Sequence, residues 1–243
     1  MIFEKTKHAV SFFDLILLVY GYAKVGKTLL ASHLVRDGRP PLFLMSEDGH
    51  LALDVHAVRI KSWDDFLKAV KKIVSHSKEI KAEHSVVILD LASEIEELCA
   101  QHVARAHGVC YLGDVPHGRA WYIAKDSFQS AVRELLTVLP VTFLTHAKER
   151  EVEVQGKVIT AIAPSISRSA FEFITGKADV IAYLAPTKDG KATLTMRPQP
   201  GLIAGSRFPA LAQKDFVFDV NNPAAVVREL EQVFSKGGVP HDA

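Results

Sequence analysis

The chain has 243 residues, of which 48% are hydrophobic and 23% charged, and its formal net charge is +1. This balance is ordinary for a globular protein with a sizeable core. A near-neutral charge excludes a strong overall basic field, although a local basic groove for nucleic acid remains compatible with it. Cys99 and Cys110 have neither a CxxC nor a Cys/His spacing, which predicts two cysteines packed as small apolar groups rather than a metal site or disulfide.

Residues 1–20 carry early lysines and an apolar stretch, as a signal peptide does. Asp14 interrupts that stretch, which is also too short to span a bilayer. We therefore expect β-structure in this segment, and a cytoplasmic protein with no membrane association.

Apolar runs alternate with helical patterns along the chain, which predicts an α/β fold with a mainly parallel central sheet flanked by helices. The first four predicted strands lack period-2 alternation, as strands buried on both faces do. The predicted strands are residues 15–20, 42–45, 86–90, 141–145 and 180–184.

Helices are predicted between these strands. The helix over residues 64–75 has Ser62 as its cap, and helical spacing predicts that it buries Phe66, Leu67, Val70, Ile73 and Val74. The other predicted helices are residues 27–36, 93–106, 121–139 and about 222–235, the last starting at Asn222-Pro223.

Two regions interrupt the alternation. Residues 108–119 contain Gly and Pro and are predicted as a loop, and residues 148–177 are predicted as a hairpin and loop insertion around Gln155-Gly156. With no repeat or second-domain signal, we expect one domain over residues 1–243, with a core at about 10–210 and a flexible tail after the last helix.

The segment from Gly21 to Thr28, GYAKVGKT, has the G-x-x-x-x-G-K-[ST] pattern of a phosphate-binding P-loop. It lies between an apolar strand and an apolar helical pattern, which is the context that the motif requires. Its glycines allow backbone N–H groups to face phosphates, Lys27 supplies positive charge, and Thr28 places a hydroxyl on Mg²⁺. We expect ATP to contact Gly21, Tyr22, Ala23, Lys24, Val25, Gly26, Lys27, Thr28 and Leu29, although Lys24 also fits a solvated surface lysine.

Three further polar residues follow predicted strands. Asp90 ends the apolar run Val86-Val-Ile-Leu, which predicts a Walker B carboxylate that holds Mg²⁺ with Thr28; a helix cap is a compatible role. Glu47 follows the strand over 42–45 and would lie beside the γ-phosphate if that strand neighbours the P-loop strand. Asp48 competes with Glu47 for activation of water, and a solvated turn is the alternative for both. His146 ends another strand, where it can contact the γ-phosphate or serve a structural role.

The order of these motifs resembles the RecA-like ATPase core, in particular the small phage-type nucleotide-binding ATPases related to the Sak group of single-strand annealing proteins. The P-loop, the run Leu42-Phe-Leu-Met-Ser-Glu-Asp-Gly49, the strand ending in Asp90, and Val141-Thr-Phe-Leu-Thr-His-Ala-Lys148 carry the resemblance. The segment 111–121 is also similar to one in such phage proteins. The resemblance implies Glu47 as the catalytic base and His146 as the γ-phosphate sensor, in a catalytic set with Lys27 and Asp90.

The resemblance also implies partners. It implies single-stranded DNA at two loops, near 108–119 and 148–168, and a homo-oligomer with ATP between subunits. The candidate DNA contacts are Arg119, Lys148, Arg150, Lys157 and Arg168. Glu149, Glu151 and Glu153 interleave with them, so a solvated charged hairpin stays open; Tyr111, Trp121 and Phe171 fit base stacking or the core. The candidates for a basic finger donated in trans are Arg207, Lys188 and Lys191.

These features predict an Mg²⁺-dependent P-loop ATPase that acts on single-stranded DNA in recombination, annealing or repair. Two alternatives stay open: a P-loop kinase of a small molecule, although no compact Arg-rich lid is evident, and a nucleotide-gated protein-interaction module without DNA.

Overall fold

The computed structural model describes residues 11–47, 53–154 and 157–237. Its helices are α1 (Lys27–Ser32), α2 (Trp63–Ser75), α3 (Ser77–Glu83), α4 (Ala92–Ala106), α5 (Arg119–Leu136), α6 (Arg168–Lys177) and α7 (Pro223–Gly237). Its strands are β1 (Leu17–Gly21), β2 (Leu42–Met45), β3 (His56–Arg59), β4 (Val87–Asp90), β5 (Val141–Val154), β6 (Lys157–Pro164), β7 (Val180–Pro186), β8 (Ala192–Thr195), β9 (Gly205–Ser206) and β10 (Phe216–Phe218).

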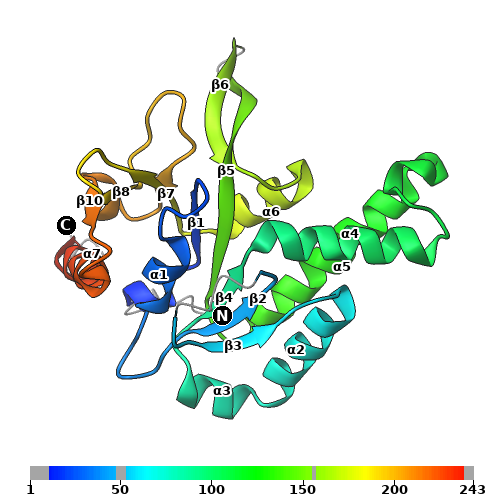
Figure 1. The fold of residues 1–243 in the computed structure, drawn as a ribbon, viewed down its shortest axis with the longest axis horizontal. Helices are drawn as coiled ribbons and strands as arrows, with labels where there is room; N and C mark the ends of the chain where they lie inside the picture. The colour runs from blue at the N-terminus through cyan, green and yellow to red at the C-terminus, as the bar shows by residue number, and fades with distance from the viewer. Residues whose placement is uncertain (1–10, 48–52, 155–156, 238–243) are drawn as a thin grey trace, which may run out of the picture.

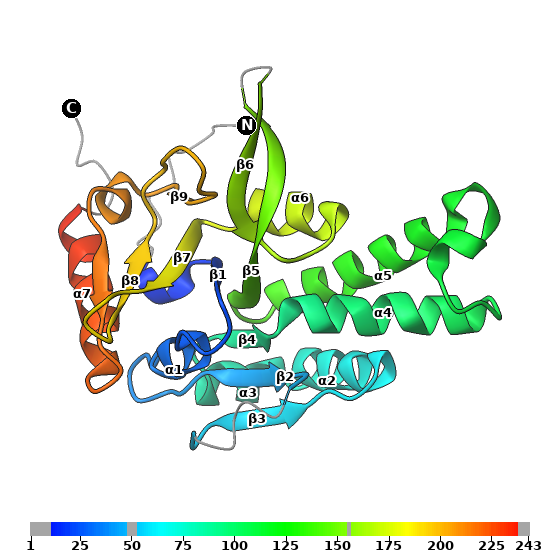
Figure 2. The same cartoon turned by 45° about the horizontal axis from the view of Figure 1, so that its top comes forward.

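The strands of the described residues form one sheet in the order β10-β8-β7-β1-β5-β4-β2-β3, with β6 paired to β5 and β9 to β7. The six strands from β7 to β3 in this order run parallel, whereas β6, β8, β9 and β10 pair antiparallel. The predicted α/β class with a mainly parallel sheet flanked by helices is therefore confirmed (Figures 1 and 2). Every parallel strand ends at the same edge, where ligands of open α/β sheets bind.

Two apolar clusters cover the two faces of the sheet. On one face Phe66 of α2, Ile95 of α4 and Phe128 of α5 pack on alternate strand residues such as Leu18. On the other face Leu30 of α1 and residues of α7 pack on the intervening strand residues. β1, β2 and β4 are buried at every position, as their continuous apolar runs predict.

Most predicted elements are confirmed within a few residues, and Ser62 does cap α2 by accepting a hydrogen bond from Asp65 N. Three expectations are wrong. Leu67 and Val74 are 41% and 36% exposed, because Trp63 and Ala69 fill the buried stripe of α2 instead. Helix α1 stops at Ser32, four residues early, because His33 leaves helical backbone geometry, and the Ser32 hydroxyl and the His33 ring bond to Leu29 O in place of a backbone N–H. Cys110 is exposed, and only Cys99 packs in the core.

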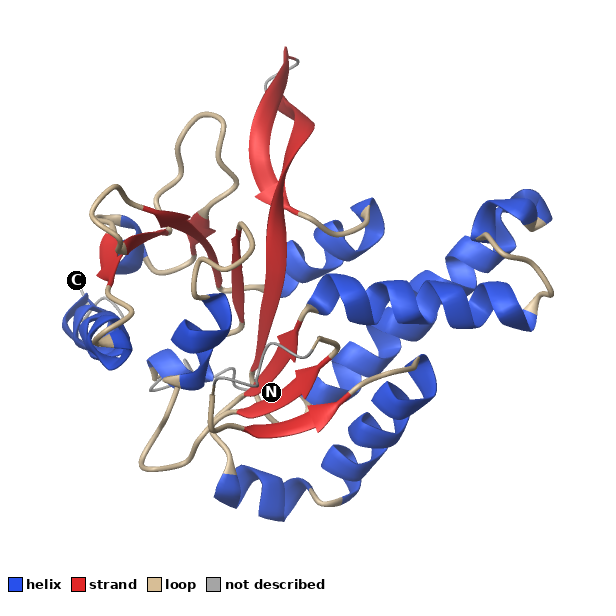
Figure 3. Ribbon diagram, in the orientation of Figure 1, coloured by secondary structure: helices blue, strands red, loops and turns tan. Residues whose placement is uncertain are grey.

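Residues 148–177 contain more regular secondary structure than the predicted hairpin and loop insertion. Strand β5 continues past the sheet and pairs with β6 from Ala147↔Pro164 to Val154↔Lys157, so the predicted hairpin is confirmed (Figure 3). Helix α6 then occupies residues expected as loop, because Ser167 caps it through Ala170 N and Ala170 and Ile174 bury one face. No helix in the described part of the chain is both long and apolar enough to cross a bilayer.

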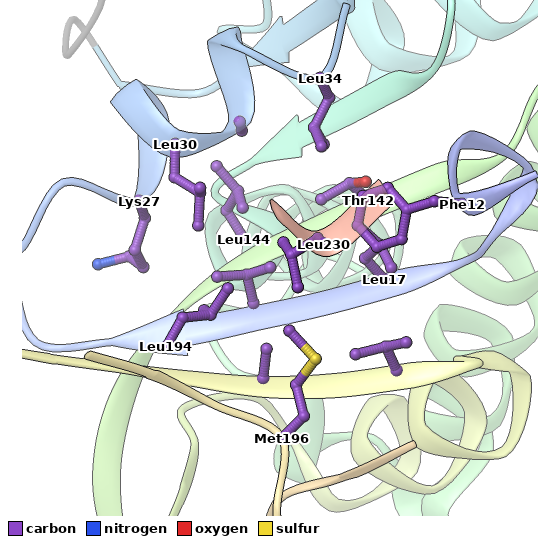
Figure 4. Close-up of a pocket in the computed structure, with 14 residues that line it drawn as sticks. Phe12, Leu17, Lys27, Leu30, Leu34, Thr142, Leu144, Leu194, Met196 and Leu230 are labelled. Carbon is purple, nitrogen blue, oxygen red and sulfur yellow. The ribbon is translucent and has the colours of Figure 1, made fainter. Parts of the chain in front are cut away.

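A small cavity lies between the sheet, α1 and α7 (Figure 4). Its volume is about 20 Å³ and its walls are apolar side chains such as Leu17, Leu30 and Met196, with the stem of Lys27 at one end. Thr142 also lines it, and its Oγ1 is buried without a hydrogen-bond partner among the described residues. The cavity is far too small for a nucleotide, but it makes Thr142 an energetic weak point of the core.

Replacing Thr142 with valine is expected to raise the free energy of unfolding by about 1 kcal/mol, because it removes an unsatisfied buried hydroxyl at nearly constant shape. Urea unfolding followed by circular dichroism measures the change. Thr145 on the same strand is the matched control, since its buried hydroxyl donates to His146 O at 3.0 Å and Thr145→Val should destabilise. A loss of stability in Thr142→Val would contradict the prediction and indicate a buried water bound to Thr142.

Candidate functional site

The P-loop joins β1 to α1 at the carboxyl edge of the sheet. Gly26 has a φ of 99°, and a Cβ there would lie 2.7 Å from the ring of Phe218; a Cβ on Gly21 would lie 2.3 Å from Leu184 O. Both positions therefore require glycine, one for backbone conformation and close packing, the other for the approach of β7. The loop backbone is thus shaped by its neighbours as well as by its own sequence.

An open pocket of about 580 Å³ lies over this loop, which is within the size range of small-molecule sites. It brings together residues that lie in or directly after four different parallel strands: the P-loop after β1, Glu47 after β2, Asp90 of β4 and His146 of β5. Of the predicted nucleotide contacts, Ala23, Lys24 and the run from Gly26 to Leu29 line the pocket, whereas Gly21, Tyr22 and Val25 do not. Leu53 and Leu91 complete the walls.

Lys27 is buried, and its ammonium donates to Gly21 O at 3.0 Å and Tyr22 O at 2.9 Å. Its Nζ points away from the small apolar cavity that its stem lines (Figure 4). Burial lowers the pKa of Lys27, while the negative charges of Asp90 and Glu47 act in the opposite direction. The ammonium is therefore held inside the loop by two backbone carbonyls, and the charges of the two carboxylates favour its protonated form.

Thr28 and Asp90 form the polar pair expected for a magnesium site. Thr28 Oγ1 donates to Asp90 Oδ2 at 2.8 Å, across the gap between α1 and β4. Burial raises the pKa of Asp90, and the hydrogen bond from Thr28 and the charge of Lys27 oppose that rise. Asp90 does not cap α4: Leu91 occupies the cap position, without a side-chain hydrogen bond. The Asp90 carboxylate is therefore turned toward the P-loop.

Glu47 is exposed and lies in the same pocket, but not for the reason expected. Strand β2 does not neighbour the P-loop strand, because β5 and β4 lie between them. Glu47 instead follows the strand that pairs with β4, where Met45 is in register with Asp90. Its charge nevertheless acts on both Lys27 and Asp90. Asp48, the competing candidate, lies outside the described residues.

His146 lies on β5, the strand between β1, which leads into the P-loop, and β4, which ends at Asp90. It is in register with Gly21 of the P-loop, and its Nδ1 is 3.5 Å from Lys27 Nζ. Its backbone O accepts a hydrogen bond from Ser165 N at 2.7 Å, at the point where the β5–β6 hairpin returns to the core. His146 therefore contacts both the P-loop lysine Lys27 and the segment in which the hairpin returns to the sheet.

Comparison with known proteins places this site in a family. The AAA domain family matches residues 14–208, which include every residue that lines the pocket. The chain belongs to the AAA domain family. It is also similar to the SPbeta prophage-derived uncharacterized protein YorG of Bacillus subtilis (strain 168), with 24% identity over 173 residues. That match covers 70% of this chain and 50% of YorG, so the chain spans about half the length of this relative.

These matches support a P-loop ATPase domain of phage type, while the narrower resemblance to the Sak group stays a prediction. Within the AAA domain, the three candidates for a basic finger lie at different edges of the sheet. Arg207 lies at the amino-terminal end of β7, opposite the P-loop edge, where it pairs with Asp179 at 2.9 Å and donates to Gly176 O. Lys188 and Lys191 lie in the turn after β7, at the P-loop edge, and Lys191 is 3.6 Å from Asp219. Arg207 is therefore the weakest candidate of the three.

The candidate DNA contacts are spread over the hairpin, α6 and the start of α5. Lys148 donates to Ile166 O at 3.4 Å, Arg150 lies 5.0 Å from the centre of the Phe171 ring, and Arg168 pairs with Glu172. The side chain of Lys157, near the hairpin tip, lies outside what the structure describes. Arg119 is exposed at the first residue of α5. Three of the five thus already have partners within the domain.

The three aromatic candidates for base stacking differ in their exposure. Tyr111 and Trp121 are 59% and 44% exposed and meet edge to face at 5.8 Å, so they form a surface pair rather than core. Phe171 packs against the main core and beneath Arg150. Sequence reasoning did not identify Leu53 or Leu91 as residues that line the pocket. Leu91 directly follows Asp90, which is a usable signal, but nothing in the sequence distinguishes Leu53.

Proposed function

We propose that this AAA domain protein binds ATP with Mg²⁺ in the pocket over the P-loop, hydrolyses it, and acts in the cytoplasm on single-stranded DNA in recombination, annealing or repair. The observation that carries the proposal is the convergence of Lys27, Thr28, Asp90, Glu47 and His146 on one pocket. These residues come from four strands that are far apart in the sequence.

The residues present fit a magnesium–nucleotide complex. The loop between Gly21 and Gly26 supplies backbone donors and the start of α1 a positive dipole end, which together suit phosphates. Thr28 and Asp90 already lie within hydrogen-bond distance, and a hydroxyl with a carboxylate suits Mg²⁺, which keeps several waters. When bound, Mg²⁺ would neutralise charge on the phosphate oxygens.

Hydrolysis additionally requires a group that takes a proton from water. Glu47 is the exposed carboxylate of the pocket, whereas Asp90 is engaged with Thr28, so the two acids have different environments and suit different roles. We assign Glu47 as the base and Lys27 as the donor that stabilises charge on the terminal phosphate. His146 would contact the same phosphate beside Lys27 and respond to its loss.

The hairpin supports a link from this site to DNA. His146 lies on β5, whose continuation forms the arm that projects from the sheet (Figure 1). Lys148 and Arg150 are alternate residues of this strand and lie on one face, while Glu149 and Glu151 take the other. A change at His146 would therefore move a strand that carries basic side chains.

A homo-oligomer with ATP between subunits is part of the proposal. Lys188 and Lys191 are exposed at the edge of the sheet that holds the P-loop, so either could extend toward a neighbouring pocket.

A small-molecule kinase is disfavoured by the absence of a compact Arg-rich lid in the sequence. The decisive measurement is ATP turnover with and without single-stranded DNA: stimulation by DNA supports the proposal, and phosphate transferred to a metabolite would replace it.

Charge reversal at Lys148, Arg150 and Lys157 is expected to weaken binding of a labelled oligonucleotide. It should also reduce the slope of log K against log salt by about 0.7 for each lost phosphate contact, or about two units in total. Charge reversal at Lys68, Lys71 and Lys72, exposed on α2, is the matched control because it changes net charge equally. Equal effects in the two triple variants would remove the hairpin as the DNA site.

A further inference from the structure

A second cavity lies beside the ATP pocket, between helix α4, the segment 110–112, the start of α5 and the segment 165–167. Its volume is about 280 Å³, far above the ~10–15 Å³ that one water requires. In Figures 1 and 2 α4 and α5 run side by side away from the sheet, with α6 and the hairpin root next to them. The cavity is therefore formed by elements that are distant in sequence and is large enough for a side chain.

The lining of this cavity combines negative charge with aromatic rings. Glu96 and Glu97 of α4 contribute two carboxylates, and Tyr111 and Trp121 contribute the edge-to-face aromatic pair. No lysine or arginine is among the lining residues that the structure describes. Carboxylates next to aromatic faces suit a cation, which gains both a charged hydrogen bond and a cation–π contact.

Glu96 is the polar centre of the cavity. Its Oε2 accepts from Ser167 N at 3.1 Å and its Oε1 from the Ser167 hydroxyl, so the carboxylate orientation is held by the residue that caps α6. Each oxygen retains acceptor capacity after these bonds. Burial raises the pKa of Glu96, and the Ser167 hydrogen bonds and the charge of nearby Lys148 only oppose that rise. A cation that entered the cavity would relieve the cost of this partly buried charge.

Two segments connect the walls of this cavity to the candidate nucleotide site. Helix α4 begins directly after Asp90 and Leu91, and Ser93 and Glu96 of its first turns face the cavity. On the opposite wall Ser165 donates its N–H to His146 O, two residues before Ser167 contacts Glu96. A shift of His146 or of the start of α4 would change the distance between the two walls.

We propose that this cavity receives an arginine side chain from a protein partner, at a site whose width follows the nucleotide state of the domain. A planar guanidinium can stack on Trp121 while it forms a forked hydrogen bond with Glu96, which a lysine ammonium cannot do. The two carboxylates oppose entry of a nucleic-acid phosphate. The inference goes beyond the ATPase and DNA proposal: binding of the arginine does not depend on that proposal, and only the link between width and nucleotide state rests on it.

Titration of the full chain with acetyl-Gly-Arg-Gly-amide tests the proposal, with the citrulline peptide as a neutral probe of the same shape. Trp121 fluorescence is the readout, because Trp63, the other tryptophan, is buried against Phe66 in the core. We expect a saturable signal with the arginine peptide and at least about tenfold weaker binding in Glu96→Gln, the scale of a lost charged hydrogen bond.

Glu97→Gln removes the second carboxylate of the cavity, which is exposed. It therefore keeps the proposal testable if Glu96→Gln fails to fold. We expect it to weaken binding about threefold, the scale of an exposed ion pair. Glu94→Gln is the matched control, since Glu94 is exposed on α4 and does not line the cavity; it should bind the peptide as wild type does.

Three results would overturn the proposal: equal binding of the citrulline peptide, wild-type binding in both Glu96→Gln and Glu97→Gln, or displacement of the arginine peptide by a single-stranded oligonucleotide. The last would assign the cavity to nucleic acid. ATP turnover by the same wild-type preparation is measured alongside. Peptide binding without turnover would count against the proposed ATPase alone, and turnover without peptide binding against this inference alone.

Discussion

Lys27→Ala is expected to lower ATP turnover by at least about 100-fold and to abolish measurable nucleotide binding by calorimetry with Mg²⁺. The variant removes the buried ammonium of the proposed phosphate site, and loss of one preorganised donor to developing charge costs about 10²–10³ in rate. In the wild type this ammonium is held 2.9–3.0 Å from two loop carbonyls, so it is positioned before nucleotide binds.

Two variants separate charge from packing. Lys27→Met keeps an apolar stem against the cavity under the loop and is expected to lose turnover as fully as alanine while retaining the fold. Lys24→Ala removes an exposed lysine of the same loop, and its effect should stay below about fivefold, the scale of an exposed ion pair. Near-normal turnover in Lys27→Met would refute the phosphate role of Lys27.

Glu47→Gln is expected to retain ATP binding and to lose turnover by about 10²–10⁴-fold, the usual contribution of a general base. Glutamine preserves size and hydrogen bonding but cannot take a proton from water. The charge of Glu47 also acts on Lys27 and Asp90, so binding affinity should change far less than the rate. Single-turnover hydrolysis and equilibrium binding, measured on the same sample, separate the two effects.

Asp48→Asn is the matched comparison, because it neutralises the competing acid one residue further along the chain. We expect it to keep turnover within about fivefold of wild type. If the two variants exchange behaviour, Asp48 is the base. If both hydrolyse ATP normally, the base is neither residue, and another group must activate the water.

The strands of the fold were predictable where burial is two-sided. The runs ending at Tyr20, Met45 and Asp90 are continuous and apolar because helices cover both faces of the sheet. This pattern can be recognised in the sequence alone. By contrast, β3 is exposed at all four positions, and β8, β9 and β10 are short and antiparallel. Their sequences carry no run or alternation strong enough to mark them, because much of their stability comes from pairing with a neighbour.

The site was predictable at the P-loop and less so elsewhere. Thr28 and Asp90 were expected together and do meet, since a motif and a strand end each determine a local position. Glu47 was placed beside the γ-phosphate on the condition that its strand neighbours the P-loop strand, and that condition is not met because strand order depends on crossovers through space. Arg207 has no local feature that distinguishes it, and only its pairing with Asp179 shows that it lies at the opposite edge.

The sequence by itself determined the P-loop, the acid at the end of β4 that meets it and the α/β class, because these depend on short-range backbone geometry and on apolar periodicity. Only the tertiary structure decided that β5 separates the P-loop strand from the Asp90 strand, which places His146 beside Lys27. It also decided that Glu96 and Trp121 share a cavity. Such neighbours are selected by packing free energy summed over the whole core, which no local segment encodes.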